Sequence, residues 1–231
     1  MKIVKNDLFD YKNRYIYQLE DGFKFSLDAI LLAEYTKVKE DLKILDMCTG
    51  NGVVPLILST KTNSEIVGFE IQEIIANIAK KSVQINKLDK QITIINEDIK
   101  NIQSYYKTNF FDIITCNPPY FKKNSSLKNI NEYKNIARHE IKIDLEEIFK
   151  LSYKNLKDNG ILYLSHRPER LDEIITIAIN NNMGVKEIVF IMTKNSENSS
   201  LILIKCVKNS KRSVKIKIKD VSKCSTYQHI F

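Results

Sequence analysis

LDMCTGNG, residues 45–52, connects a short apolar run to a second apolar segment and holds two of the chain's six glycines. A turn from a strand into a helix needs residues that tolerate unusual dihedral angles and let a ligand approach the backbone. The N–H groups at the start of the helix would then face the bound molecule. The loop lacks the Lys-Ser/Thr pair of a P-loop, and Pro55 stands where a dinucleotide fingerprint has its third glycine. The stretch therefore predicts an α/β protein with a ligand-binding loop of neither type.

Apolar runs alternate with amphipathic stretches outward from this loop, which is typical of repeated strand–helix units. The predicted strands are Lys43–Asp46, Glu65–Glu70, Ile92–Ile95, Asp112–Cys116, Ile161–Ser165, Val185–Ile191 and Leu201–Val207. Helices are predicted at Val53–Ser59, Ile71–Asn86, Leu145–Leu156 and Pro168–Asn181. This order indicates a Rossmann-like α/β fold, a seven-stranded, mostly parallel sheet with helices on both faces. We expect a single domain over residues 1–231, with an N-terminal extension at 1–41, a core at 42–207 and a basic C-terminal tail at 208–231.

The composition, with 43% hydrophobic and 28% charged residues, is that of an ordinary globular protein. No apolar run approaches the ~18 residues of a membrane span, and the first residues lack the apolar core of a signal peptide. The four cysteines form no Cys-x-x-Cys pair, so neither a disulfide framework nor a zinc site is expected. We expect a cytoplasmic protein with no membrane partner and no metal; the oligomeric state stays open, a monomer included.

The formal net charge is +8, from 36 basic and 28 acidic residues. Such an excess favours a polyanionic partner, because Lys and Arg contacts to phosphate dominate nucleic-acid affinity. The chain is also rich in Lys, Asn and Ile and has no Trp, as AT-rich coding sequences often are. Codon bias therefore explains the charge as well as a nucleic-acid partner does.

Acidic residues end the next two predicted strands. Glu70 lies 18 residues after Gly52, where a carboxylate can accept both ribose hydroxyls of an adenosine. Asp98 follows the third strand and could meet an adenine amino group. A solvated surface acid is the alternative for Glu70, and a helix N-cap is the alternative for Asp98. Loop and acids at successive strand ends resemble motifs I, II and III of class I methyltransferases, which implies S-adenosyl-L-methionine as the cofactor.

The fourth predicted strand runs straight into Asn117-Pro118-Pro119-Tyr120, which holds half of the chain's four prolines. An aryl amine is a poor nucleophile because its lone pair is delocalised into the ring. If the Asn117 side-chain oxygen and the Pro118 carbonyl accept hydrogen bonds from the two N–H groups of the amine, its nitrogen is drawn toward tetrahedral geometry. The prolines fix the backbone that presents these acceptors, and Tyr120 offers a ring face for stacking, worth about 1–3 kcal/mol per base. The alternative is a proline-stiffened turn.

This tetrapeptide is similar to motif IV of amino-methyltransferases, whose members modify adenine N6, guanine N2 or glutamine side chains. The resemblance implies a planar nitrogen as the target and all four residues of the tetrapeptide as catalytic. With motifs I to III it implies a set of cofactor-binding residues: Asp46, Cys48, Thr49, Gly50, Gly52, Glu70, Ile71, Asp98, Ile99 and Asn117.

Two further segments narrow the family. FKFSLDAILLA at residues 23–33 resembles the N-terminal block of the tRNA (adenine-N6) methylases of the adenine-37 type, which modify the purine beside the anticodon. That resemblance implies that Phe25 and Asp28 lie near the methionine end of the cofactor. ARHE at residues 137–140 is similar to a tetrapeptide of the same family, where Arg138 can grip phosphate and His139 can bond a base edge. The alternatives are an ordinary packing helix for residues 23–33 and a solvated surface for residues 137–140.

Basic residues continue this pattern. Residues 205–219 contain seven Lys or Arg and no acid, and Lys122 and Lys123 directly follow the tetrapeptide. The alternative for the basic run is a hairpin or edge strand guarded by lysines. The predicted nucleic-acid-binding residues are Lys122, Lys123, Arg138, His139, Lys211 and Arg212.

These patterns together predict methyl transfer from S-adenosyl-L-methionine to adenine N6 in tRNA, at position 37. Glutamine N5 methylation of a protein, adenine-N6 methylation of DNA and guanine-N2 methylation of rRNA use the same tetrapeptide and remain alternatives. Residues 1–41 leave little room for the helical substrate-binding domain of glutamine methylases, and no segment is long enough for a DNA-recognition domain. A catalytically inactive RNA-binding module is disfavoured because the loop and the tetrapeptide are both intact.

Overall fold

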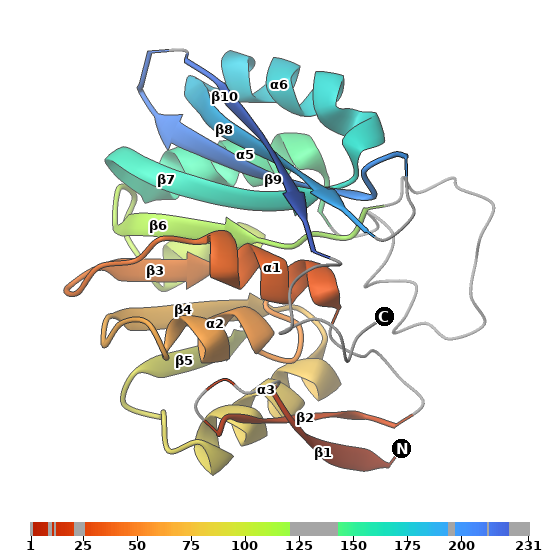
Figure 1. Cartoon of the computed structure of the whole chain (residues 1–231). Coiled ribbons are helices and arrows are strands. Elements are labelled where there is room, and N and C mark those ends of the chain that lie inside the picture. Colours follow the sequence, from red (N-terminus) through yellow and green to blue (C-terminus); the bar gives the residue numbers. More distant parts are fainter. Residues whose placement is uncertain are drawn as a thin grey trace.

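An eight-stranded sheet crosses the molecule in the order β10-β8-β9-β7-β6-β3-β4-β5 (Figure 1). The computed structural model describes residues 2–8, 11, 13–20, 26–120, 143–193, 197–211 and 213–221. The strands are β3 (Lys43–Asp46), β4 (Glu65–Glu70), β5 (Ile92–Asn96), β6 (Phe111–Cys116), β7 (Leu156–His166), β8 (Met183–Met192), β9 (Leu201–Lys208) and β10 (Lys215–Asp220). Only β9 runs against its neighbours β7 and β8. The Rossmann-like, mostly parallel sheet is confirmed, with one strand more than the seven expected.

The added strand, β10, lies within the predicted basic tail. Its sequence KIKIKD alternates Lys with Ile, and the strand pairs in parallel with β8 at the sheet edge. Lys217 forms an ion pair with Glu187 at 2.5 Å, and Lys219 forms one with Glu34 at 3.7 Å. For this part of the run, the edge strand guarded by lysines is the arrangement that the structure adopts.

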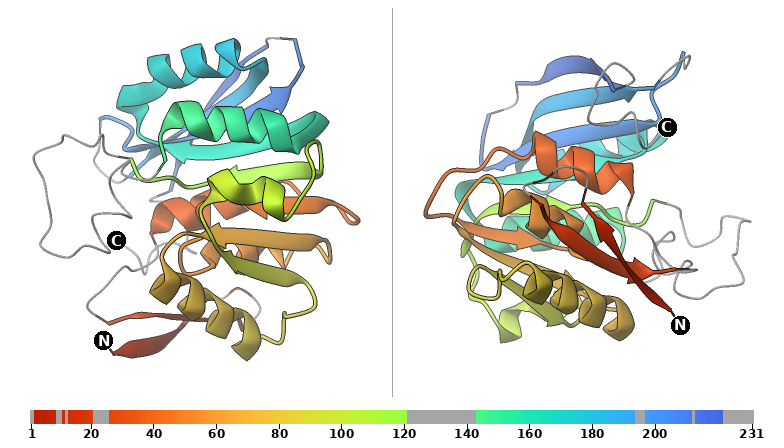
Figure 2. Two further views of the ribbon diagram at one scale, coloured as in Figure 1. Left: turned by 180° about the vertical axis from the view of Figure 1, so that it is seen from behind. Right: turned by 60° about the horizontal axis from the view of Figure 1, so that its bottom comes forward.

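Helices cover both faces of the sheet (Figure 2). One face carries α1 (Leu27–Tyr35), α2 (Val53–Leu58) and α3 (Glu73–Ile85); the other carries the 3₁₀ helix η1 (Ile99–Ser104), α5 (Leu145–Asn155) and α6 (Leu171–Asn180), which the 3₁₀ turn η2 (Pro168–Arg170) precedes. Neighbouring strand residues such as Ile44 and Leu45 enter opposite cores, because side chains alternate along a strand. Across the described residues, no helix combines the length and apolar character that crossing a membrane requires.

The N-terminal extension forms an antiparallel hairpin of β1 (Ile3–Asp7) and β2 (Tyr15–Leu19), which packs on α3. Leu19 contacts the apolar side chains Ile75 and Ile78 of that helix. The Tyr17 amide donates a hydrogen bond to the Ser82 hydroxyl at 2.9 Å. The extension is thus attached to α3, the helix that follows β4, and Glu70 is the last residue of β4.

Gly68, in the middle of β4, allows the loop before α2 to lie against the sheet. A Cβ atom at this position would lie 2.7 Å from Thr49 Oγ1 and 2.9 Å from Thr49 Cβ, so the loop would have to move. We expect Gly68→Ala to lower the free energy of unfolding by about 1–3 kcal/mol, the usual cost of overpacking. Chemical denaturation monitored by circular dichroism measures this change. An unaltered midpoint and slope would mean that the loop yields freely.

Candidate active site

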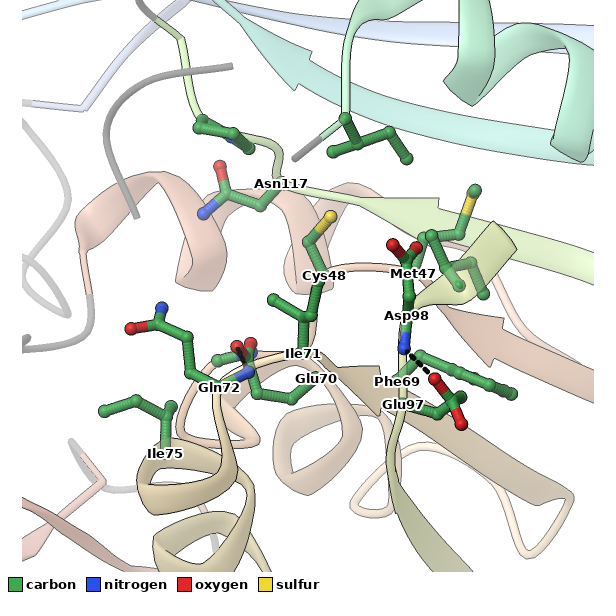
Figure 3. Close-up of a pocket in the computed structure, with 14 residues that line it drawn as sticks. Met47, Cys48, Phe69, Glu70, Ile71, Gln72, Ile75, Glu97, Asp98 and Asn117 are labelled. Carbon is green, nitrogen blue, oxygen red and sulfur yellow. Dashed lines mark hydrogen bonds between the residues drawn. The ribbon is translucent and has the colours of Figure 1, made fainter. Parts of the chain in front are cut away.

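A pocket opens at the carboxyl ends of β3, β4, β5 and β6 (Figure 3). Parallel strands bring their carboxyl ends to one edge of the sheet, so residues far apart in sequence meet there. The pocket is partly open to solvent and lies where α/β sheets commonly bind small molecules. Its lining residues are Met47, Cys48, Gly50, Phe69, Glu70, Ile71, Gln72, Ile75, Glu97, Asp98, Ile99, Asn117, Pro119 and Ile143.

The glycine loop approaches this pocket through its backbone. Gly50 and Gly52 have φ angles of 53° and 85°, in the left-handed region that favours glycine. The Gly50 N–H donates to Glu70 Oε2 at 3.0 Å, and the Gly52 N–H donates to the Thr49 carbonyl at 2.9 Å. These two donors are satisfied within the protein.

Asp46 lies beneath the loop and is buried. Its Oδ1 accepts a hydrogen bond from the Thr115 hydroxyl at 2.7 Å. Burial raises the pKa of Asp46 to about 6, while the hydroxyls of Thr115 and Thr49 act in the opposite direction. Three residues predicted to bind the cofactor, Asp46, Thr49 and Gly52, therefore support the loop and are absent from the pocket lining.

Glu70 is 8% exposed, so it is not the solvated surface acid of the alternative reading. Its carboxylate accepts hydrogen bonds from the Gly50 N–H at 3.0 Å and the Gln72 N–H at 2.9 Å. Burial raises the pKa of Glu70 to about 7, although these two hydrogen bonds lower it. A buried acid with such a pKa, at the base of a pocket, is typical of a ligand-binding group.

Asp98 is the helix N-cap of the alternative, and it also lies in the pocket lining. Its Oδ1 accepts from the Lys100 N–H at 3.0 Å and so caps η1, and the residue also lines the pocket. The neighbouring Glu97 accepts the Asp98 N–H at 2.8 Å (Figure 3). Cys48, Ile71 and Ile99 lie in the same lining, so the structure brings together most of the predicted cofactor residues.

The tetrapeptide at the end of β6 meets this pocket through Asn117 and Pro119, whereas Pro118 is buried and is not part of the lining. The Asn117 side-chain oxygen accepts hydrogen bonds from the Ser165 hydroxyl at 2.6 Å and from the Tyr120 hydroxyl. The Arg167 guanidinium lies 4.7 Å from the centre of the Tyr120 ring. Tyr120 thus belongs to a polar cluster that joins the ends of β6 and β7.

Asp28, in the first turn of α1, completes this cluster. Its Oδ2 lies 3.7 Å from Arg167 Nη2, and its carboxylate lies within hydrogen-bonding reach of Tyr120. Burial raises the pKa of Asp28, while Arg167 and Tyr120 lower it. The structure therefore places Asp28 against the tyrosine of the tetrapeptide and outside the pocket lining.

Sequence reasoning missed the segment that anchors this cluster, Ser165-His166-Arg167 at the end of β7. His166 is fully buried, and its ring lies edge-on to the Tyr120 ring, with 5.2 Å between the two ring centres. Burial lowers the pKa of His166 to about 4, and the positive charge of Arg170 contributes in the same direction. The imidazole is therefore neutral at pH 7. The available signal was a polar group directly after an apolar strand, as at Glu70 and Asn117.

The predicted nucleic-acid residues are mostly untested by the structure. Lys122, Lys123, Arg138, His139 and Arg212 lie outside the described residues, and so does Phe25, which was predicted to bind the cofactor. Lys211 follows β9, whose last residue Lys208 pairs with Met183 at the start of β8. Lys211 therefore lies at the end of the sheet where the parallel strands begin, whereas Asn117 lies at the other end, where they finish. In the part of the chain that the structure describes, no three His, Cys, Asp or Glu side chains gather closely enough to hold a metal.

Known proteins share this sequence pattern and fold. Residues 38–221 match a family described as "Methyltransferase domain". The tRNA1(Val) (adenine(37)-N6)-methyltransferase of Bacteroides fragilis is 26% identical over 190 residues, which cover 82% of this chain and 79% of that protein. A solved structure of a predicted O-methyltransferase from Agrobacterium tumefaciens has a TM-score of 0.66 at 18% identity, covering 88% of this chain and 93% of its own.

A second solved structure is a geranyl diphosphate C-methyltransferase from Streptomyces coelicolor, in complex with Mg²⁺, geranyl diphosphate and S-adenosyl-L-homocysteine. It has a TM-score of 0.58 at 11% identity, covering 78% of this chain and 78% of its own. At such identities both structures establish the fold alone. The family match spans most of the chain, and this protein belongs to the methyltransferase domain family.

Proposed function

We propose that this chain transfers a methyl group from S-adenosyl-L-methionine to N6 of adenine in tRNA, at position 37 beside the anticodon. The observation that carries the proposal is that Asn117 and Pro119 line the same pocket as Glu70 and Asp98. The groups that would hold the methyl donor and the group that would hold the target nitrogen therefore meet in one cavity. The name of the Bacteroides fragilis relative supports adenine 37 as the target.

The chemistry of the lining fits this cofactor. Its described members include three acids, Glu70, Glu97 and Asp98, and no Lys, Arg or His. Such a lining disfavours a phosphate-bearing ligand and favours a cationic one that presents hydroxyl and amino donors. Apolar side chains beside the acids, such as Ile71 and Ile99, would pack on a flat ring. We assign Glu70 to the ribose hydroxyls and Asp98 to the adenine amino group of the cofactor.

The bound cofactor supplies an electrophilic methyl group on a sulfonium. The Asn117 side-chain oxygen and the Pro118 carbonyl would accept hydrogen bonds from the two N–H groups of the adenine amino group. This arrangement would turn the lone pair of the nitrogen toward the methyl group. Pro118 and Pro119 restrict the backbone that carries both acceptors. Positioning two groups for an in-line displacement supplies much of a catalysed rate. The methylated nitrogen would carry a positive charge and release its extra proton readily to water, so no strong base is required.

A labelling experiment tests the proposal. Labelled S-adenosyl-L-methionine is offered with unmodified total tRNA, rRNA, genomic DNA and a release factor, and the labelled product is digested for mass spectrometry. We expect label in tRNA as N6-methyladenosine, and mapping of the labelled fragment to position 37. Label in the release factor, in DNA adenine or in rRNA guanine would replace this proposal with the corresponding alternative.

A tRNA substrate agrees with the net charge of +8 and supports a cytoplasmic location. Phosphate contacts to Lys and Arg would supply sequence-independent affinity. The proposed transfer uses no metal.

Tyr120 is expected to stabilise the adenine once the base has left its stack. Swinging a base out costs a few kcal/mol, and stacking on a ring returns about 1–3 kcal/mol. We expect Tyr120→Ala to lower turnover on whole tRNA about 10- to 100-fold, whereas Tyr120→Phe, which keeps the ring, retains most activity. Steady-state kinetics on an unmodified transcript measure both. Equal, mild effects would exclude stacking, and a large loss in Tyr120→Phe would show that the hydroxyl is essential.

A further inference from the structure

The side-chain oxygen of Asn117 is fully engaged in the free protein. It accepts one hydrogen bond from the Ser165 hydroxyl at 2.6 Å and another from the Tyr120 hydroxyl. An amide oxygen offers two lone pairs. An incoming amino group can therefore bond this oxygen only if one of the two hydroxyls withdraws.

The two hydroxyls differ in their freedom to withdraw. Ser165 is fully buried near the end of β7, and its backbone pairs with Leu203 of β9. The preceding residue, Leu164, pairs with Cys116, which fixes Ser165 beside Asn117. A residue held by strands on both sides cannot leave without breaking the sheet.

Tyr120 is partly buried and follows two prolines beyond the end of β6. Its hydroxyl also has two other acceptors within reach, the Ser165 hydroxyl at 3.4 Å and the carboxylate of Asp28. Turning from Asn117 to Asp28 would leave no buried hydroxyl unsatisfied, which removes the usual penalty for breaking a buried hydrogen bond. Tyr120 is therefore the donor that can give way.

We propose that Ser165 is a positioning residue for methyl transfer. Its hydroxyl keeps one lone pair of Asn117 Oδ1 occupied throughout and thereby fixes the rotation of the amide. The Tyr120 hydroxyl holds the other lone pair until the amino group of the base takes its place. Ser165 does not line the pocket, so it acts through Asn117 and not on the substrate. This inference rests on the proposed function for its kinetic consequence, but not for the contact itself.

Removal of the Ser165 hydroxyl should lower turnover without weakening the binding of either substrate. We expect Ser165→Ala to lower kcat about 10- to 100-fold, the scale of a misplaced reacting group. KM for tRNA and Kd for S-adenosyl-L-methionine should stay within twofold of the unmodified protein. Ser165→Thr, which keeps a hydroxyl, should restore turnover, and Ser165→Cys provides a second, less bulky donor if the extra methyl of Thr does not fit.

Ser82→Ala is the matched control. Ser82 is equally buried, and its hydroxyl accepts from the Tyr17 N–H at 2.9 Å and donates to the Ile78 carbonyl at 3.0 Å, on α3. Loss of this hydroxyl should cost stability without changing kcat. In addition, Ser165→Ala should have no further effect in an Asn117→Ala background, because residues that act as one unit are not additive.

A nuclear magnetic resonance measurement separates this inference from the proposed function. In protein labelled with ¹⁵N-asparagine, the side-chain resonances of Asn117 are those lost in Asn117→Ala. We expect them to shift in Ser165→Ala and to remain in place in Ser82→Ala. A shift in a protein that methylates none of the offered substrates would sink the proposed function and keep the contact. Unmoved resonances, unchanged kcat, or equal losses of kcat and cofactor affinity would overturn the role of Ser165.

Discussion

Asn117→Ala is expected to lower turnover by about 100-fold or more, the scale of losing a positioned polar partner, while the affinity for S-adenosyl-L-methionine stays close to that of the unmodified protein. Asn117 lines the pocket and also belongs to the polar cluster at the ends of β6 and β7, where its side-chain oxygen accepts hydrogen bonds from two hydroxyl groups. Without that oxygen, one of the two N–H bonds of the amino group has no acceptor and the nitrogen stays planar.

Single-turnover kinetics with labelled cofactor, together with calorimetry, distinguish chemistry from binding in this variant. Asn117→Asp serves as the control because it keeps an acceptor oxygen at the same place, and we expect it to retain more activity than the Ala variant. Turnover near normal in Asn117→Ala would show that this side chain does not hold the nitrogen. Parallel loss of turnover and cofactor affinity would assign it a structural role.

The sequence predicted the central strands well because burial and alternation act locally. The bounds of β3 and β4 agree with the predicted strands residue for residue. Since carboxyl ends of parallel strands meet at one edge, a polar residue directly after each apolar run could be assigned to a common site. Glu70, Asp98 and Asn117 reach the same pocket for this reason.

The direction and order of strands could not be obtained in the same way. The basic run at 205–219 allowed either a nucleic-acid contact or a hairpin or edge strand guarded by lysines. In the structure β9 is antiparallel to β8, so the run turns at the amino ends of the parallel strands and returns along β10. Lys211 is left at that end of the sheet, while Lys219 reaches Glu34 near the end of α1. Composition records the charge of such a run but not its path.

Ser165 escaped prediction for a related reason. Its contact with Asn117 spans 48 residues of sequence and exists only because β7 is the neighbour of β6. No motif links the two positions, and the polar residues that end the apolar run of β7 do not reveal which strand lies beside them. Asp28 was placed by resemblance near the cofactor, but its contacts with Arg167 and Tyr120 depend on the packing of α1 beside β7.

Glu70→Ala should produce the largest loss of cofactor binding. Two charge-assisted hydrogen bonds to the ribose are worth about 1.5–3 kcal/mol each, so we expect affinity to fall about 10²- to 10⁴-fold. The substitution also leaves the Gly50 and Gln72 N–H groups without their present acceptor. Isothermal titration calorimetry at pH 8 measures the change. Glu97→Gln, at a partly exposed acid of the same lining, should bind almost normally, and equal losses in both variants would point to general electrostatics.

The same carboxylate should give cofactor binding a characteristic pH dependence. Burial raises the pKa of Glu70 to about 7, so below this pH the free protein holds it mostly protonated. Only the ionised form accepts both ribose hydroxyls, and affinity should therefore fall toward tenfold per pH unit below 7 and level off above it. Glu70→Gln should remove this dependence, apart from a smaller contribution near pH 6 from Asp46, whereas Glu97→Gln should keep it. A flat profile in the unmodified protein would mean that the ribose does not rely on this carboxylate.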